Sequence, residues 1–313
     1  MPLTKTIMMK LNLVFMCVLC FGSSSLLAEM YKYKDSSGKW AFSDKKPEHM
    51  EPAHVEKINY AKAKQKFTRP SLDVKPDGKY LIYKAHNPFH AVIQCFLQFK
   101  DNLGVKRVSE MLDADSTRIL YKSKPNEKKR VYNFWCVIGD PKSQPLTTLV
   151  LPPFLDFKPM KISQGFKGRF SHQSQPGLYA VDIGMSVGTK IVAVKKGVVI
   201  STKDDYAAAG VSSPFFFDKA NYVNIMHDDG TYAIYAHLLL GSVKVKKSQM
   251  IEAGQVIGLS GNTGYSTGPH LHFAIMHNAK GRTESIPFKF SQPNKKAVVP
   301  KRGVWLLPDI KRH

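Results

Sequence analysis

The most informative stretch of this chain reads Gly261-Asn262-Thr263-Gly264-Tyr265-Ser266-Thr267-Gly268-Pro269-His270-Leu271-His272-Phe273. Its glycines allow tight turns and close approach of the backbone. His270 and His272 are two residues apart, and on a β-strand such residues point to the same side. The two imidazoles would lie about 7 Å apart along the strand. Both can therefore approach one metal ion, one as a ligand and one as a neighbour.

A second segment supplies a histidine and a carboxylate. Residues 165–172 are rich in glycine and aromatic residues and end in His172, and Asp182 follows ten residues later. Residues 222–227 and 231–238 are expected to form a hairpin around Asp228-Asp229-Gly230, with His237 near its end. Two histidines, one carboxylate and an open fourth position are typical of a catalytic zinc site rather than a closed structural one.

These segments, taken in order, resemble a lysostaphin/LytM-type zinc endopeptidase domain over about 157–290, roughly the last two fifths of the chain. The final motif, 266–273, matches residue for residue. Residues 221–238 fit the central hairpin of the family, and 252–258 fit the turn before the last motif.

The resemblance implies a role for five residues and a Zn²⁺ cofactor. The metal ligands would be His172, Asp182 and His272, and the catalytic histidines that do not bind the metal would be His237 and His270. No H-E-x-x-H motif is present, so histidine must do the proton transfer that a glutamate does in other zinc peptidases.

The chain departs from the family in two places. The common spacing is H-x-x-x-D, which would put the first histidine at 178, and Leu178 is there. Pro176 and Gly177 would allow the longer loop to fold back and return His172 to the metal. The second departure is the insert 204–220, which would either line a groove or cover the sheet.

The 313 residues suggest about two domains. The expected fold class is all-β, with a small N-terminal β module, a β-sandwich-like middle domain and a C-terminal antiparallel peptidase sheet. The predicted parts are an export signal (1–28), a β-hairpin module (29–50), a linker (51–78), a β-sandwich-like domain (79–150), the zinc metalloendopeptidase domain (155–290) and a basic tail (291–313). We expect the tail to be irregular, and the alternative is that its apolar run 304–307 packs on the protein. The hairpin module resembles one found in exported bacterial proteins.

The N-terminus has the pattern of an export signal. Lys5 and Lys10 precede the apolar run 11–21, and small residues lead to Ala28. The alternative is an uncleaved anchor, since 11–28 holds 18 uncharged residues. Either way we expect an exported protein of the periplasm or cell envelope. Two cysteines remain after the signal, Cys95 and Cys136, and the sequence leaves open whether they form a disulfide or stay as buried thiols.

The formal net charge is +22, and it falls to +20 without Lys5 and Lys10. Such a field attracts polyanions, but export separates the protein from nucleic acid. The expected partners are peptidoglycan and anionic envelope surfaces, although scattered lysines can also serve solubility alone.

The sequence therefore predicts a zinc endopeptidase that hydrolyses peptide cross-links of peptidoglycan, with the direct cross-link of Gram-negative walls favoured. One alternative is a catalytically silent relative that activates another wall hydrolase, with a regulatory partner unknown. A second is a protein that only binds the wall, through its charge and its middle domain.

Overall fold

The computed structural model describes residues 30–34, 40–43, 55–58, 69–101, 104–145, 149–211, 214–293 and 297–308. Within these ranges the chain forms strands and loops, apart from a single 3-10 turn, η2 (Pro214–Phe216). The predicted all-β class is therefore confirmed. In these same ranges no helix has the length and apolar character needed to cross a membrane. The predicted export signal lies outside the described residues.

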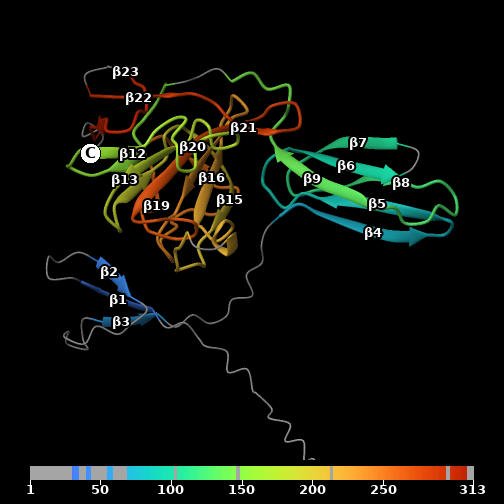
Figure 1. Ribbon diagram of the computed structural model, residues 1–313, viewed down its shortest axis with the longest axis horizontal. Helices are drawn as coiled ribbons and strands as arrows, with labels where there is room; N and C mark the ends of the chain where they lie inside the picture. Colours follow the sequence, from blue (N-terminus) through green and yellow to red (C-terminus); the bar gives the residue numbers. More distant parts are fainter. Residues whose placement is uncertain are drawn as a thin grey trace, which may run out of the picture.

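Three short strands form the N-terminal sheet (Figure 1). The central strand β1 (Met30–Lys34) pairs antiparallel with β2 (Trp40–Ser43) and with β3 (Val55–Ile58). The first pair is the expected hairpin, whereas β3 lies in the segment expected to be a linker. Its four residues give too short an alternation to be recognised among the surrounding lysines and prolines.

The middle domain consists of two three-stranded sheets. Their strands are, in spatial order, β4 (Ser71–Asp77), β5 (Tyr80–His86) and β8 (Thr117–Lys122), and then β7 (Gly104–Leu112), β6 (Ile93–Asp101) and β9 (Tyr132–Ile138). The sheets share one core, in which the rings of Tyr83 and Phe99 meet edge to face at 5.4 Å. Cys95 and Cys136 are register partners on β6 and β9 and form a disulfide, so the question that the sequence left open is resolved.

Two strands of this domain differ from the sequence prediction. Strand β4 occupies the end of the predicted linker. It tolerates Pro76 because it is an edge strand, where a residue without an N–H group costs no hydrogen bond to a neighbouring strand. Strand β7 was not expected, because Lys106, Arg107 and Glu110 interrupt its apolar pattern. All three side chains are exposed, although Arg107 points to the opposite face of the strand from Lys106 and Glu110.

A nine-stranded antiparallel sheet forms the main body of the C-terminal domain (Figure 1). Its strands are, in spatial order, β18 (Met250–Ile251), β15 (Gly197–Lys203), β16 (Tyr222–Met226), β17 (Tyr232–Ala236), β20 (His270–Asn278), β13 (Val181–Gly184), β12 (Met160–Gln164) and β24 (Trp305–Leu306), with β21 (Thr283–Ser285) paired to β20. Two small sheets accompany it: β11 (Phe154–Leu155), β14 (Lys190–Val192) and β19 (Val256–Leu259), and β10 (Leu149–Val150), β22 (Lys289–Ser291) and β23 (Ala297–Val298).

The two faces of β20 have different neighbours. Leu271, Phe273 and Ile275 are buried in the main core of the domain. On the opposite face, Ala274 and Met276 pack in a cluster with Ala91 of the middle domain. The middle domain therefore covers one end of this face, and the other end, where the two histidines begin the strand, stays open.

The C-terminal segment is not irregular throughout, because its apolar run 304–307 packs on the domain, the alternative that the sequence left open. Strand β24 pairs antiparallel with β12, in the register Met160 to Leu306 and Lys161 to Trp305. Leu306 is fully buried, and Val304 packs against the main core. The apolar run at 304–307 is short, but a sheet edge needs only a few residues to extend it.

Candidate metal centre

Neighbouring strands of the large sheet bring the predicted site residues together. In the antiparallel ladders, His272 on β20 lies opposite Asp182 on β13 and opposite Ala236 on β17. His237 directly follows Ala236, with a positive φ of 65° that turns the chain at the end of the strand. Ladder geometry thus gathers residues 35 to 90 positions apart around His272.

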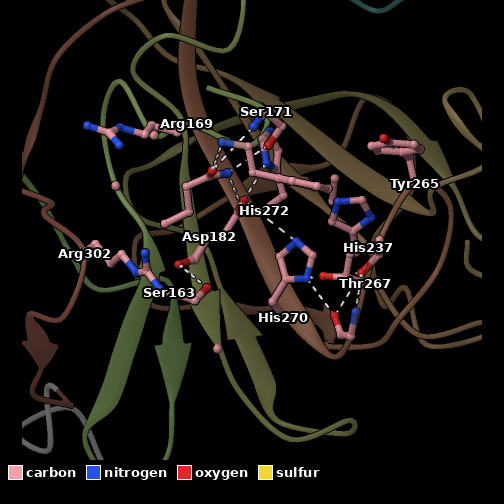
Figure 2. A pocket seen from close by; sticks show the side chains of 18 of the residues that line it. Ser163, Arg169, Ser171, Asp182, His237, Tyr265, Thr267, His270, His272 and Arg302 are labelled. Atoms are coloured by element: carbon pink, nitrogen blue, oxygen red, sulfur yellow. Dashed lines mark hydrogen bonds and ion pairs between the residues drawn. The ribbon is translucent and has the colours of Figure 1, made fainter. Parts of the chain in front are cut away.

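His270 and His272 extend from the open face of β20, as their spacing predicts. Leu271 between them is fully buried in the core, while both histidines remain partly exposed. Figure 2 shows both imidazoles in the same cavity.

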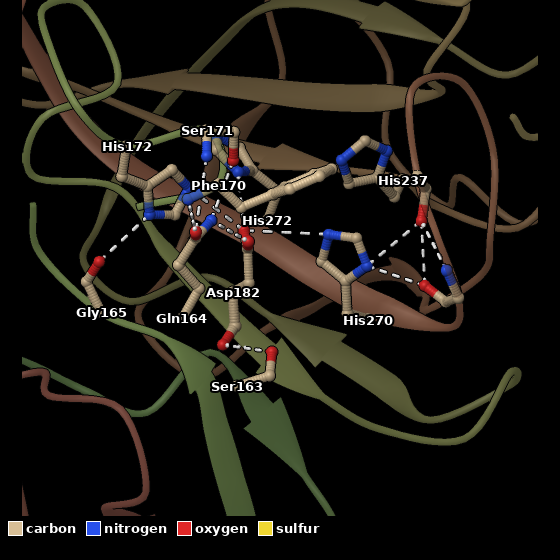
Figure 3. Close-up of polar contacts among 12 residues, drawn as sticks. Ser163, Gln164, Gly165, Phe170, Ser171, His172, Asp182, His237, His270 and His272 are labelled. Carbon is tan, nitrogen blue, oxygen red and sulfur yellow. Dashed lines mark hydrogen bonds and ion pairs between the residues drawn. The ribbon is translucent and has the colours of Figure 1, made fainter. Parts of the chain in front are cut away.

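Three ligand-type side chains converge at the centre of the site (Figure 3). Atoms of His172, Asp182 and His272 that could bind a metal all lie within 4.8 Å of one another. Asp182 Oδ1 is 2.9 Å from His272 Nδ1 and 3.4 Å from His172 Nε2. Burial alone would raise the pKa of Asp182, but the two adjacent imidazoles lower it well below its usual range. The carboxylate is therefore ionised and available to a cation.

The long loop before Asp182 folds back, as the sequence suggested. His172 N donates a hydrogen bond to Gly168 O at 3.0 Å, and Ala180 N donates to Gly177 O at 2.8 Å. His172 is thereby fully buried beside Asp182. Leu178 does not join the cluster, and its carbonyl instead accepts a bond from Lys167 N.

The hydrogen bonds of His172 leave one ring nitrogen free. Its Nδ1 lies 3.2 Å from the carbonyl oxygen of Gly165, which can only accept, so Nδ1 carries the hydrogen. When the ring is neutral Nε2 holds the lone pair, and this buried atom makes no hydrogen bond within the described part of the chain. A buried polar atom without a partner is costly unless something binds it. Two imidazole nitrogens and a carboxylate oxygen are typical ligand atoms for zinc.

Gln164, which the sequence analysis did not identify, supports the carboxylate. Its Nε2 donates to Asp182 Oδ2 at 2.8 Å, and its Oε1 accepts from Phe170 N at 3.0 Å. The same side chain therefore ties Asp182 to the loop that carries His172. Its position at the end of β12, just before Gly165, is the only sequence signal that it offers.

The other two histidines form a pair beside the cluster. Their ring centroids are 4.6 Å apart, and each Nδ1 lies against a backbone carbonyl: Thr263 O at 2.6 Å for His237 and Gly268 O at 2.8 Å for His270. Each Nδ1 therefore donates its hydrogen to a carbonyl, and in the neutral form of either ring Nε2 is the nitrogen that holds the lone pair. Nε2 of His270 is 3.7 Å from Asp182 Oδ1. Burial, together with repulsion from His270 and His272, lowers the pKa of His237 to about 3.

The five residues lie in or beside a cavity of about 1030 Å³, and all but the buried His172 line it. One wall is aromatic: the rings of Phe217 and Tyr265 are 4.5 Å apart, and Phe170 stacks on Tyr265 at 6.3 Å. Phe217 is 66% exposed and comes from the insert 204–220, which thus contributes to the groove wall, the first of the two alternatives considered.

Comparison with known proteins finds peptidase relatives for the C-terminal part of the chain. Residues 177–283 match Peptidase family M23. Lysostaphin of Staphylococcus simulans is 36% identical over 113 residues, which are 36% of this chain and 21% of that protein. The peptidoglycan DD-endopeptidase ShyA of Vibrio cholerae is 38% identical over 119 residues, which are 36% of this chain and 24% of ShyA.

Among solved structures, the catalytic domain of lysostaphin from Staphylococcus simulans is 28% identical, with 38% of this chain and 80% of that domain covered and a TM-score of 0.27. A score this low does not establish a shared fold over the whole chain. The matched region spans less than a third of the full-length relatives, so what the chain shares with them is one domain.

Proposed function

We propose that this chain, whose residues 177–283 form a lysostaphin/LytM-type domain of peptidase family M23, is a zinc-dependent endopeptidase that hydrolyses peptide cross-links of peptidoglycan. One observation carries the proposal: a three-residue ligand cluster lies at one open cavity together with two further histidines. A structural metal site would be closed by a fourth side chain and would need no second pair of histidines.

In this proposal His172, Asp182 and His272 hold Zn²⁺. Three features support that assignment. Nε2 of His172 makes no hydrogen bond in the described part of the chain, Asp182 is ionised, and both imidazoles lie within 3.4 Å of Asp182 Oδ1. When bound, zinc would lower the pKa of a coordinated water toward ~7 and polarise the scissile carbonyl. The open side of the cluster faces the cavity, where substrate and water can enter.

His237 and His270 would orient the attacking water and move protons. Each Nδ1 donates a hydrogen bond to a backbone carbonyl, which leaves Nε2 of each ring to face the water. A pKa of about 3 keeps His237 neutral at physiological pH, so its Nε2 can accept a hydrogen bond from the water. Asp182 is the sole acidic residue in the described lining of the cavity, and its oxygens are engaged, which leaves the proton transfer to the histidines.

The substrate is proposed to be the direct cross-link between stem peptides. The relatives do not decide this by themselves, because one is a peptidoglycan DD-endopeptidase and another of similar identity is a glycyl-glycine endopeptidase. The predicted export signal and the N-terminal hairpin, which resemble those of Gram-negative proteins, favour the direct cross-link and an envelope location.

Defined substrates test this choice of bond. Soluble muropeptide dimers, one joined by a direct cross-link and one by a glycine bridge, would be incubated with the zinc-loaded chain from Glu29 onward. Cleavage of the first dimer alone supports the proposal. Cleavage of the glycine-bridged dimer alone would overturn the assignment of the bond. Cleavage of neither dimer would contradict the proposed activity, and it would indicate an autoinhibited enzyme if zinc is bound and the activator or wall-binding alternative if zinc is not bound.

A further inference from the structure

We propose that the C-terminal segment adds a carboxylate-binding subsite to the cleft, in which Arg302, with Lys301 and Arg169, binds a carboxylate of the stem peptide. The inference rests on the proposed function, since it names what part of that substrate this end of the cleft takes. The segment lies outside residues 177–283, the region matched to the peptidase family.

Backbone contacts fix this segment against the sheet. Beyond the pairing of β24 with β12, Ile162 N donates to Val304 O and Gly303 N donates to Ile162 O, both at 2.9 Å. Gly303 has a φ of 89°, which glycine adopts readily, and it turns the chain immediately after Arg302. The two cations at 301 and 302 are therefore held at a tight turn on an ordered strand edge.

The same turn presses against the loop of the metal centre. A Cβ atom at Gly165 would lie 2.7 Å from Pro300 O and 2.9 Å from the Cα of Lys301, so only glycine permits this approach. Phe166 N also donates to Pro300 O at 3.4 Å. Because Gly165 O orients the His172 ring, one residue links the turn to the ligand cluster.

Within the described part of the chain, no carboxylate forms an ion pair with the cations at this end of the cavity. Lys167, Arg169, Lys301 and Arg302 all line it, and none has an ion pair with an acidic side chain in the described ranges. Asp182, also in the lining, is already bonded to Gln164 and His272. Figure 2 shows Arg169 and Arg302 to one side of the histidines and Tyr265 to the other. The cleft thus has a cationic end and an aromatic end.

A carboxylate suits this cationic end. Guanidinium groups stay protonated, and their planar donors match a carboxylate with two parallel hydrogen bonds. The peptides of peptidoglycan carry free carboxylates near their cross-links, and a strand crossing the metal centre would extend toward the turn. A charged hydrogen bond of this kind is worth about 1.5–3 kcal/mol, so losing it should weaken binding roughly tenfold or more.

The test measures binding separately from turnover. The variants Arg302→Gln and Arg169→Gln would be made in an otherwise intact chain and in a His270→Ala background that prevents cleavage. Titration calorimetry would follow binding of a directly cross-linked dimer, either with free stem carboxylates or with those carboxylates amidated. Lys244→Gln, which removes an exposed charge outside the cavity, is the matched control.

We expect each arginine variant to bind the free-carboxylate dimer about tenfold more weakly, with unchanged zinc content, and to bind the amidated dimer as the unsubstituted chain does. The Lys244→Gln control should behave as the unsubstituted chain. Equal affinity for both dimers in the unsubstituted chain, or an equal loss on both dimers in the variants, would overturn the subsite. Because calorimetry needs no cleavage, failure of the subsite is distinguishable from failure of the proposed hydrolysis.

Discussion

Gln164 donates a hydrogen bond from Nε2 to Asp182 Oδ2 at 2.8 Å, and this contact directs the other carboxylate oxygen, Oδ1, toward His172 and His272. The amide oxygen of Gln164 simultaneously accepts from Phe170 N, in the loop that ends at His172. One side chain therefore sets the position of two members of the ligand cluster. Gln164 is a positioning residue, since it belongs to the surroundings of the cluster rather than to the cluster itself.

Replacing Gln164 should weaken metal binding without removing a ligand. We expect Gln164→Ala to lower zinc affinity about 10- to 100-fold, the range usual for the loss of an outer hydrogen bond to a metal ligand. Competition with a chromogenic chelator measures this affinity. Gln98→Ala, on the middle domain and outside the cavity, is the control. Unchanged affinity in Gln164→Ala would show that the carboxylate needs no such support.

The two proposed classes of histidine should separate in metal content. Asp182→Ala and His272→Ala should lose zinc, because each removes one of three donors. His270→Ala and His237→Ala should keep one equivalent of zinc and lose about 10²-fold or more in rate. Elemental analysis beside a cleavage assay gives both quantities. Equal zinc loss in all four variants would contradict the division of roles.

The free energy of unfolding should depend on pH because of the titration of Asp204. This carboxylate accepts bonds from Ser242 N and Val243 N, yet burial raises its pKa to about 6. Between pH 4 and 6 the folded chain then binds more protons than the unfolded chain, so the contribution of Asp204 to stability falls as pH rises through that window. Partial solvent exposure limits the effect to about 1 kcal/mol.

Urea unfolding of Asp204→Asn at pH 4 and pH 7 measures that contribution. Asparagine has one hydrogen-bond acceptor oxygen fewer than aspartate at every pH. The informative quantity is therefore how the difference in free energy of unfolding between the variant and the unsubstituted chain changes with pH. We expect the variant to gain relative to the unsubstituted chain as pH rises. A difference that stays constant would show that Asp204 titrates near its ordinary pKa in the folded chain.

The aromatic wall should affect substrate binding more than folding. Phe217 is 66% exposed, so Phe217→Ala should change the free energy of unfolding by less than about 0.5 kcal/mol. Loss of a ring that contacts Tyr265 in the cleft should raise KM several-fold while kcat changes little. Phe157→Ala, which removes an even more exposed ring outside the cavity, is the control. Identical KM and kcat in the two variants would show that the insert does not contribute to substrate binding.

The sequence was most informative where metal-binding residue types occur at the two-residue spacing of a β-strand. Because strand residues two apart share a face, His270 and His272 could be placed on one side before the fold was known. Asp182 lies opposite His272 because of the register between strands β13 and β20. The register between strands far apart in the chain cannot be deduced from a single sequence. His172 was identified through a family resemblance, and its burial depends on how a ten-residue loop closes.

The missed features depend on tertiary contacts. Pro76 was interpreted as part of a linker, because its tolerance at a sheet edge is visible only once β4 has found β5. The segment 304–307 is too short to predict a strand, and β12 provides its pairing edge. Gln164 has no distinguishing neighbours in the sequence, since its partners are 6 to 18 residues away.

The central claim is that the three-donor cluster holds a zinc ion that cleaves wall peptides. The most direct test incubates the zinc-loaded chain from Glu29 onward with intact peptidoglycan sacculi, with and without a chelator, and identifies released muropeptides by mass spectrometry. The account predicts chelator-sensitive loss of cross-linked dimers and a matching gain of monomers. Release that persists after zinc is removed, or intact dimers with one equivalent of zinc bound, would contradict it.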